Sequence, residues 1–316
     1  MKPLFSLLSP AGPRGRLSTL ILHRVLPRAD ELFPGEVDAE RFDTICGWVR
    51  QWFNVLPLAE ATQRMFDRSL PARALAITFD DGYADNHDVA MPILRRHGLT
   101  ATFFIATGYL DGGRMWNDTV IESVRGAAGP MLDLTGLDLG QLGALDISSV
   151  PAKRSAIDTI IAATKYMHAE QRTQCVEQIA SRARVALPTH LMMSTQQVRA
   201  MRDGGMQVGA HTVTHPILAR LEDKAAMQEM RGSRQHLEEI LRAPVSLFAY
   251  PNGKPGADYS PRDVTLAREC GFDAAFTTSP GAARPTSDPF QLPRYTPWRQ
   301  KRLGFAAQLL RPLVST

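Results

Sequence analysis

Residues 74–108, ALAITFDDGYADNHDVAMPILRRHGLTATFFIATG, indicate the fold class. This stretch opens with an apolar run at 74–79, continues through a helical pattern at 85–97 that ends at Gly98, and closes with an apolar run at 101–106. Short continuous apolar runs joined by a helix are typical of parallel strands that are buried on both faces. The stretch therefore predicts one strand–helix–strand unit of an α/β protein.

Five further apolar runs extend this pattern along the chain. They lie at 17–22, 206–210, 245–250, 274–278 and 291–295, and the last is the least apolar of them. Helical patterns between the runs include 38–52, 195–203 and 221–242. A chain of 316 residues accommodates two ordinary domains or one large α/β barrel, which commonly needs about 250 residues.

One interval breaks the alternation of strands and helices. Residues 107–205, between the third and fourth runs, are far more than one helix requires. Within them, residues 109–193 contain a glycine-rich part followed by helical patterns at 152–167 and 169–186. Because the strand series resumes afterwards, we expect one domain over residues 1–316 that carries a mainly helical insertion at 109–193.

The composition excludes several classes of protein. Hydrophobic residues make up 44% of the chain and charged residues 22%, which is unlike a disordered or collagen-like protein. Cys46, Cys175 and Cys270 are too few and too widely spaced for a disulfide scaffold. They are interpreted as ordinary thiols and fit a reducing compartment.

The two ends of the chain are basic. Residues 1–28 and residues 289–316 each contain five Lys or Arg and no acid, so the rest of the chain is net acidic although the total is +4. Leucines and phenylalanines accompany these charges, so the ends fit either contact with an anionic membrane face or packing against the barrel with solvated arginines. Nucleic acid is disfavoured because no stripe of aromatic and basic residues occurs.

The sequence predicts a cytoplasmic location. No stretch approaches the roughly 18 apolar residues of a membrane span, and Pro10, Gly12 and Pro13 interrupt the apolar start before a signal peptide develops. Docking on the inner membrane face is the peripheral alternative. An unrecognised export route to the periplasm stays open.

Reactive residues follow the predicted strands. In α/β barrels the carboxyl ends of the strands carry the active site. The residues at these ends are His23, Asp80 with Asp81, His211, Tyr250 and Arg294. This gathering predicts an active site at one rim of the barrel.

Two carboxylates and two imidazoles form a candidate metal site. They belong to Asp80, Asp81, His211 and His215. Adjacent residues after a strand point in different directions, so one carboxylate can bind a metal while the other acts on water; a helix-capping turn is the alternative. The two histidines have chelate spacing, and Pro216 favours a loop over a helix for them. Two imidazoles and one carboxylate leave an open position, which is typical of catalytic Zn²⁺, although Fe²⁺ or another divalent ion also fits.

The motifs TFDDG (78–82), HTVTH (211–215) and FAYPNG (248–253) resemble those of the polysaccharide deacetylase family, the NodB-homology domain of carbohydrate esterases. The third motif is similar to that of the group related to poly-N-acetylglucosamine deacetylases. LILHRV (20–25) and GFDAAFTTSPG (271–281) extend the likeness. The resemblance implies a distorted seven-stranded (β/α) barrel, in agreement with the seven apolar runs.

The resemblance also implies roles for individual residues. Asp80 is the expected general base, while Asp81, His211 and His215 are the expected metal ligands. The backbone N–H of Tyr250 is expected to help hold the oxyanion of the reaction.

Three further assignments rest on less of the family pattern. The motif that supplies the family's general acid is not recognisable here, so His23 is proposed as the acid or its support, with a strand-capping histidine as the alternative. Arg294 either orients Asp80 or is structural. Trp116 and Trp298 are candidates for stacking on sugar rings, with core packing as the alternative.

These residues predict a metal-dependent hydrolase that removes N-acetyl groups from an acetylated amino sugar in a polysaccharide or lipid-linked glycan. Two alternatives remain: an amidohydrolase of a small non-carbohydrate amide, and an inactive carbohydrate-binding barrel. The insertion is expected to serve as a lid or substrate-side subdomain, because it leaves and rejoins the barrel at the active rim. Docking on the inner membrane face is expected to bring that rim beside a lipid-linked glycan.

Overall fold

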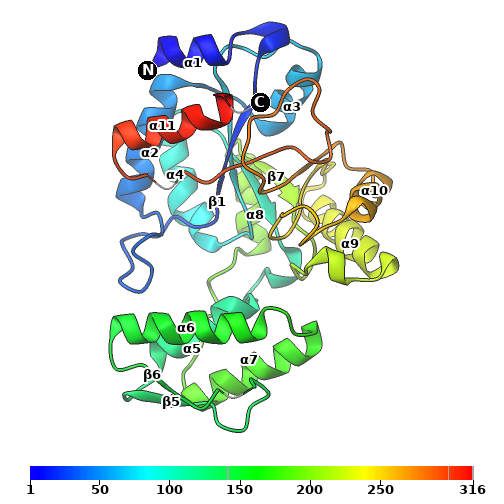
Figure 1. The fold of residues 1–316 in the computed structure, drawn as a ribbon. Coiled ribbons are helices and arrows are strands. Elements are labelled where there is room, and N and C mark those ends of the chain that lie inside the picture. The colour runs from blue at the N-terminus through cyan, green and yellow to red at the C-terminus, as the bar shows by residue number, and fades with distance from the viewer. Residues whose placement is uncertain (141, 298, 315–316) are drawn as a thin grey trace. The chain divides into compact units, whose positions relative to one another are not determined.

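The chain folds into two compact units in a computed structural model that describes residues 1–140, 142–297 and 299–314. The barrel unit comprises Met1–Arg28, Gly35–Asp111 and Met193–Thr316, and the insertion unit comprises Ala29–Pro34 and Gly112–Met192. Figure 1 shows the elements of each unit.

A seven-stranded parallel sheet forms the core of the barrel unit. Its strands are β1 (Ser18–Leu22), β2 (Asn54–Val55), β3 (Ala74–Phe79), β4 (Thr102–Ile105), β7 (Gln207–Ala210), β8 (Leu247–Ala249) and β9 (Ala274–Phe276). The order is β1-β3-β4-β7-β8-β9, and β2 pairs with the start of β3. Every residue of β1, β3 and β4 is buried, as continuous apolar runs predict.

The predicted strand at 291–295 has a different form. It makes only single bridges, from Leu292 to Phe276 of β9 and from Tyr295 to Leu20 of β1, both parallel. Pro293 lies between them and has no N–H for a ladder. The segment therefore joins β9 to β1 without being a regular strand. The fold class is confirmed as a distorted (β/α) barrel, with six of the seven predicted runs forming strands and the short β2 unpredicted.

Helices cover the sheet. They are α1 (Lys2–Leu8), α2 (Ala39–Trp52), α3 (Leu58–Phe66), α4 (Met91–Arg96), α8 (Thr195–Asp203), α9 (Asp223–Leu241), α10 (Pro261–Glu269) and α11 (Arg302–Val314). The single turns are η1 (Gly12–Arg14), η2 (Asn86–Ala90), η3 (Thr107–Tyr109) and η4 (Leu218–Arg220). Local sequence sets where helices begin: Asp38 accepts the Arg41 N–H before α2, and Ser194 forms a capping box with Gln197 before α8.

The insertion unit has a core of its own. Helices α5 (Trp116–Gly126), α6 (Val150–Thr164) and α7 (Ala169–Ala183) pack with a hairpin of β5 (Met131–Asp133) and β6 (Ala144–Asp146) around buried Val124, Ile157 and Ile179. The two expected helices are present within three residues of their predicted ends. Residues 29–34 also belong to this unit, since Asp30 holds Arg125 through two hydrogen bonds of 2.6 and 3.0 Å.

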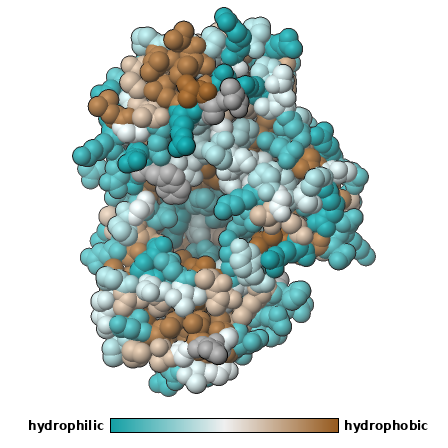
Figure 2. All heavy atoms as spheres, in the orientation of Figure 1, coloured by the Kyte–Doolittle hydropathy of each residue, from teal (hydrophilic) through white to brown (hydrophobic). Residues whose placement is uncertain are grey.

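The two ends of the chain pack on the barrel. Phe5 of α1 lies 4.4 Å from Phe53, and Phe305 of α11 lies 5.4 Å from Trp48, between ring centroids. Other apolar side chains of these helices stay exposed, and Figure 2 shows hydrophobic residues gathered over α1. Within the described residues, no helix combines the length and the apolar character that crossing a membrane requires.

Candidate active site

The turn after β3 presents two adjacent carboxylates. The Asp80 N–H still pairs with Leu22 of β1, and the chain then turns sharply at Asp81 (φ 77°) and Gly82 (φ 93°). A Cβ at position 82 would lie 3.0 Å from Ile105, so glycine suits both the angle and the space. The turn sends the two carboxyl groups in different directions, as the adjacent positions predict.

The HTVTH segment forms a loop after β7, as Pro216 predicts. Thr212 (φ 66°) and His215 (φ 53°) both have left-handed backbone angles, and the His215 N–H donates to Thr212 Oγ1 at 3.0 Å. Such angles cost about 1–2 kcal/mol per non-glycine residue and gather at functional sites. This geometry presents both imidazoles from one short loop.

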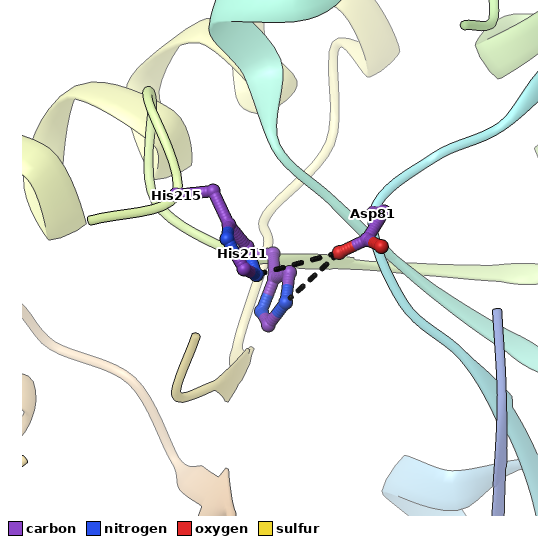
Figure 3. Close-up of side chains that lie close together, drawn as sticks. All are labelled: Asp81, His211 and His215. Atoms are coloured by element: carbon purple, nitrogen blue, oxygen red, sulfur yellow. Dashed lines mark ion pairs between the residues drawn. The ribbon is translucent and has the colours of Figure 1, made fainter. Parts of the chain in front are cut away.

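Asp81, His211 and His215 meet at a single carboxylate oxygen (Figure 3). Asp81 Oδ1 lies 3.5 Å from His211 Nε2 and 3.4 Å from His215 Nε2. This oxygen is buried and has no hydrogen-bond partner. Since His211 Nδ1 lies 2.7 Å from the carbonyl oxygen of Ala249, its N–H belongs on Nδ1 and Nε2 keeps a lone pair. The three groups fit a divalent cation, which would satisfy the unpaired oxygen.

Electrostatics support a cation at this position. Burial lowers the pKa of His215 to about 4, so its imidazole is neutral and able to act as a ligand at pH 7. Burial opposes charge on His211, but Asp80 and Asp81 raise its pKa above the usual value. Two carboxylates therefore attract positive charge to the place where the imidazole nitrogens converge.

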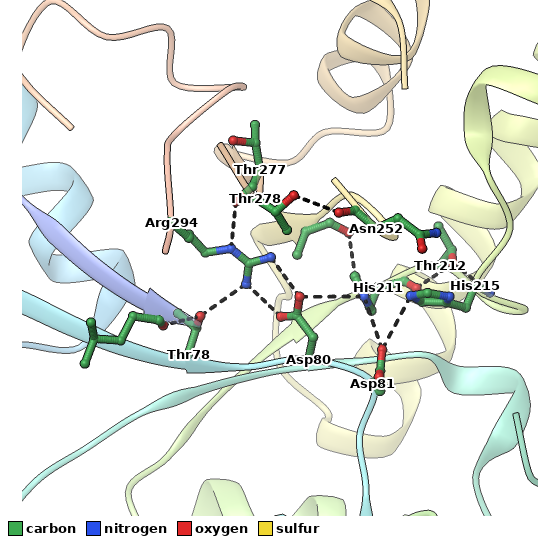
Figure 4. A network of polar contacts seen from close by, with 12 residues as sticks. Thr78, Asp80, Asp81, His211, Thr212, His215, Asn252, Thr277, Thr278 and Arg294 are labelled. Atoms are coloured by element: carbon green, nitrogen blue, oxygen red, sulfur yellow. Dashed lines mark hydrogen bonds and ion pairs between the residues drawn. The ribbon is translucent and has the colours of Figure 1, made fainter. Parts of the chain in front are cut away.

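Asp80 is held by a buried arginine. Arg294 donates to Asp80 Oδ1 at 2.7 Å and Oδ2 at 2.8 Å, and it also contacts Thr78 Oγ1 and the Thr277 carbonyl (Figure 4). Burial raises the pKa of Asp80, but Arg294 and His211 outweigh it and hold the pKa below its ordinary value. Asp80 is thus a fixed carboxylate at neutral pH.

Replacement of Arg294 is expected to alter both stability and pH dependence. Arg294→Met leaves a buried carboxylate without its partner, so the free energy of unfolding should fall by about 3–5 kcal/mol. Loss of the cation also raises the pKa of Asp80, so the acid limb of the kcat/KM profile should move to higher pH. Arg294→Lys, which keeps the charge but not the two-pronged geometry, should shift less. Denaturant unfolding and a pH–rate profile measure these effects, and an unmoved acid limb in a folded variant would contradict them.

Glu229 of α9 supports the HTVTH loop and was not anticipated from the sequence. Its Oε2 accepts the N–H groups of Val213 and Thr214, both at 2.8 Å, and its Oε1 accepts the Thr214 hydroxyl at 2.7 Å. A glutamate in an ordinary amphipathic helix gives no local signal of this role. The carboxylate stabilises a loop whose backbone angles are unfavourable.

Glu229→Ala is expected to weaken metal binding about 10- to 100-fold, because partners that orient ligands contribute on this scale. Gln228→Ala, at the exposed neighbouring position of the same helix, is the matched control and should bind as the wild type does. Competition with a chromogenic chelator measures the affinity. Equal affinity of the two variants would assign Glu229 no part in holding the ligands.

His23 lies after β1 on a segment fixed by the chain after β3. Asn86 donates to the His23 carbonyl at 2.9 Å, while Asp85 accepts the Val25 N–H at 3.1 Å and pairs with Arg24 at 2.8 Å. The His23 side chain is exposed. Burial raises the pKa of Asp81, but His211, His215 and His23 together hold that pKa below its usual value. A proton-carrying role for His23 stays a prediction.

Tyr250 requires a correction. Its N–H donates to the Phe276 carbonyl at 3.1 Å within the sheet, its hydroxyl donates to Phe290, and its ring stacks on Tyr259. This N–H is therefore not free for an oxyanion. Two residues further, no described residue accepts a hydrogen bond from the Asn252 N–H, in the loop where Thr278 donates to the Asn252 carbonyl (Figure 4).

The remaining predicted residues belong to the sugar-binding hypothesis. Trp116 begins α5 of the insertion unit and is half-buried, with the Arg172 guanidinium 4.9 Å from its ring centroid. Trp298 lies outside the described residues. The insertion itself leaves and rejoins the barrel at one point, because the Asp111 N–H donates to Met193 and the Met193 N–H donates to Gly82.

Comparisons with known proteins identify the family of the chain. The family model for polysaccharide deacetylase matches residues 67–127 and 159–275, more than half of the chain. A relative from Bacillus subtilis (strain 168), named "Putative polysaccharide deacetylase YxkH", is 20% identical over 249 residues, which cover 78% of this chain and 60% of that protein. The match thus spans less than two thirds of the relative.

Solved structures share the fold. The Streptococcus pyogenes deacetylase PplD has a TM-score of 0.63 at 18% identity, covering 94% of this chain and 99% of that one. IcaB from Ammonifex degensii has a TM-score of 0.62 at 19% identity, covering 95% and 98%. The family model matches more than half of the chain, in two segments that flank residues 128–158, and the structure has the same fold as these deacetylases. The chain therefore belongs to the polysaccharide deacetylase family.

Proposed function

We propose that the chain is a metal-dependent hydrolase that cleaves the C–N bond of an N-acetyl group on an amino sugar, in a polysaccharide or lipid-linked glycan. One observation carries the proposal. Asp81 Oδ1 is buried without a hydrogen-bond partner between two imidazole nitrogens, and a second carboxylate, Asp80, is held beside them by Arg294. Ligands and base thus come from one turn and one loop.

Asp81, His211 and His215 would hold the cation, which we propose to be Zn²⁺ by default or another divalent metal. When bound, a divalent cation supplies Lewis-acid polarisation of the amide carbonyl and makes water a stronger nucleophile. Two imidazoles and one carboxylate leave room for water and substrate.

Asp80 would accept the proton of the attacking water, as its fixed carboxylate is ionised at neutral pH. The water oxygen forms a bond to the carbonyl carbon, and the Asn252 N–H is a candidate donor to the resulting oxyanion. The C–N bond then breaks as the nitrogen gains a proton, for which His23 is the proposed source. The products are acetate and a free amino sugar.

We also propose Trp116 and Trp298 as sugar contacts and the insertion unit as a lid or substrate-side subdomain. A cytoplasmic location is supported by three free cysteines that are all buried, as in proteins of reducing compartments. The proposed hydrolysis does not depend on these assignments, and an experiment that refutes them leaves the hydrolysis proposal unchanged.

Acetate release from a substrate panel tests the proposed function. The metal-loaded protein is expected to release acetate from N-acetylglucosamine oligomers, with little from acetanilide-type amides. Turnover of the small amides alone would favour the amidohydrolase. Glycan binding with no turnover under any metal would favour an inactive carbohydrate-binding barrel, in which the paired base and ligands would have no use.

A further inference from the structure

An apolar surface is exposed where α1 and α11 lie together. Leu4 and Leu7 of α1 are 43% and 77% exposed, and Val314 at the end of α11 is 60% exposed. The opposite side of α1 is anchored, since Phe5 is fully buried. Figure 2 shows the hydrophobic residues clustered over α1. The helix therefore presents leucines to the surroundings from a fixed position.

A basic pocket accompanies this surface. It has a volume of ≈390 Å³ and is lined by Pro13, Arg14, Gly15, Arg16, Arg68, Arg284, Pro285 and Thr286. Four of these residues are arginines and none is acidic. Burial lowers the pKa of Arg16, and the charge of Arg284 lowers it further. The pocket thus concentrates positive charge that an anion would neutralise.

Hydrogen bonds place the pocket beside the apolar surface. The Arg16 guanidinium donates to the carbonyl of Leu313, next to exposed Val314. The hydroxyl of Ser9, directly after α1, donates to the Arg16 carbonyl at 2.9 Å. The pocket therefore borders the ends of both α1 and α11.

The arginines at the pocket differ in how they are held. No described residue forms a side-chain hydrogen bond or ion pair with Arg14 or Arg68, both of which are exposed. These two guanidinium groups can turn toward a ligand without breaking an existing contact. Leucines beside unpaired arginines are the combination by which proteins lie on anionic bilayers.

We propose that the α1–α11 surface and the arginine pocket dock the protein on an anionic membrane, with lipid phosphates at the arginines and Leu4 and Leu7 among the acyl chains. The exposed leucines call for an apolar partner and the arginines call for an anionic one, and an anionic bilayer is both. The proposal does not depend on the hydrolase chemistry.

Docking in this way directs the active site away from the bilayer. Arg16 precedes β1, and Ser9 accepts the N–H of Arg73, directly before β3, so the docking surface lies at the amino ends of the strands. Asp80, Asp81 and His211 follow the carboxyl ends of β3 and β7. The expectation that docking brings the site beside a membrane-anchored glycan is therefore replaced by access to glycan on the solvent side.

Vesicle sedimentation of the full-length protein tests the docking proposal. Phosphatidylcholine vesicles with about 30% phosphatidylglycerol should bind the protein, whereas pure phosphatidylcholine should not. Raising NaCl from about 0.1 to 0.5 M should release it. Arg14→Gln/Arg68→Gln should weaken binding roughly thirtyfold, and Leu4→Ser/Leu7→Ser roughly tenfold or more.

The control removes two charges elsewhere. Arg28→Gln/Lys224→Gln changes exposed residues after β1 and at the start of α9, and it should bind the anionic vesicles as the wild type does. Equal binding to neutral and anionic vesicles, or equal loss in both arginine-site and control variants, would overturn the proposal. A dimer in solution that Leu4→Ser/Leu7→Ser dissociates, without vesicle binding by the wild type, would instead assign the surface to a second copy of the chain.

Discussion

The double variant His211→Ala/His215→Ala is expected to purify without a bound metal ion, while the wild type holds one per chain. The reason is geometric: both Nε2 atoms face the same unpaired oxygen of Asp81, at 3.5 and 3.4 Å. Without them, one carboxylate remains, which cannot hold a transition metal alone. Elemental analysis after loading with Zn²⁺ and removal of excess ion measures the stoichiometry.

The matched control is His190→Ala/His236→Ala, which removes two exposed histidines from other parts of the chain. This control should retain the metal. Circular dichroism should show both double variants folded, since the ligand loop is also held by Glu229. Near-stoichiometric metal in the folded His211→Ala/His215→Ala variant would refute the assignment of these ligands.

Asp80→Asn is expected to lower kcat by about 10²- to 10⁴-fold, the range for loss of a positioned general base. The amide has nearly the shape of the carboxylate and can still accept a hydrogen bond from Arg294, but it cannot take a proton from water. Metal content should stay at the wild-type level, because Asp80 is not among the ligands. KM should change less than kcat.

Asp273→Asn is the control for this measurement, because Asp273 is exposed before β9, at the other end of the barrel. It should show wild-type kinetics. Wild-type turnover by Asp80→Asn with its metal content verified would transfer the role of base to another group.

The strands of the fold were predictable because parallel strands that are buried on both faces consist of continuous apolar runs. Residues 74–79 and 101–106 contain β3 and β4. Residues 291–295 were harder, because Pro293 cannot join a ladder and the segment bridges its neighbours at single residues. Residues 29–34 were assigned to the barrel by their place in the chain, whereas their contacts, such as Asp30 with Arg125, lie in the insertion unit.

The part of the site formed by residues of the sequence motifs was predictable. The residues elsewhere in the chain that hold those motifs in place were not. Asp81, His211 and His215 stand in two short motifs, and they meet as their spacing indicated. Glu229 stands in an unremarkable helical pattern, so only tertiary structure connects it to the loop. Tyr250 follows a strand, but hydrogen bonding to Phe276 continues through it and consumes its N–H.

Acetate release under matched metal conditions shows whether a bound divalent metal and Asp80 are both needed for deacetylation. An N-acetylglucosamine oligomer is incubated with wild-type protein stripped of metal, wild-type protein reconstituted with one Zn²⁺ per chain, and reconstituted Asp80→Asn. We expect equal amounts of acetate and free amine from the reconstituted wild type and none above background from the stripped protein. Release by Asp80→Asn should be at least about 100-fold slower. Equal release by the stripped and reconstituted wild type, or by Asp80→Asn and wild type, would contradict it.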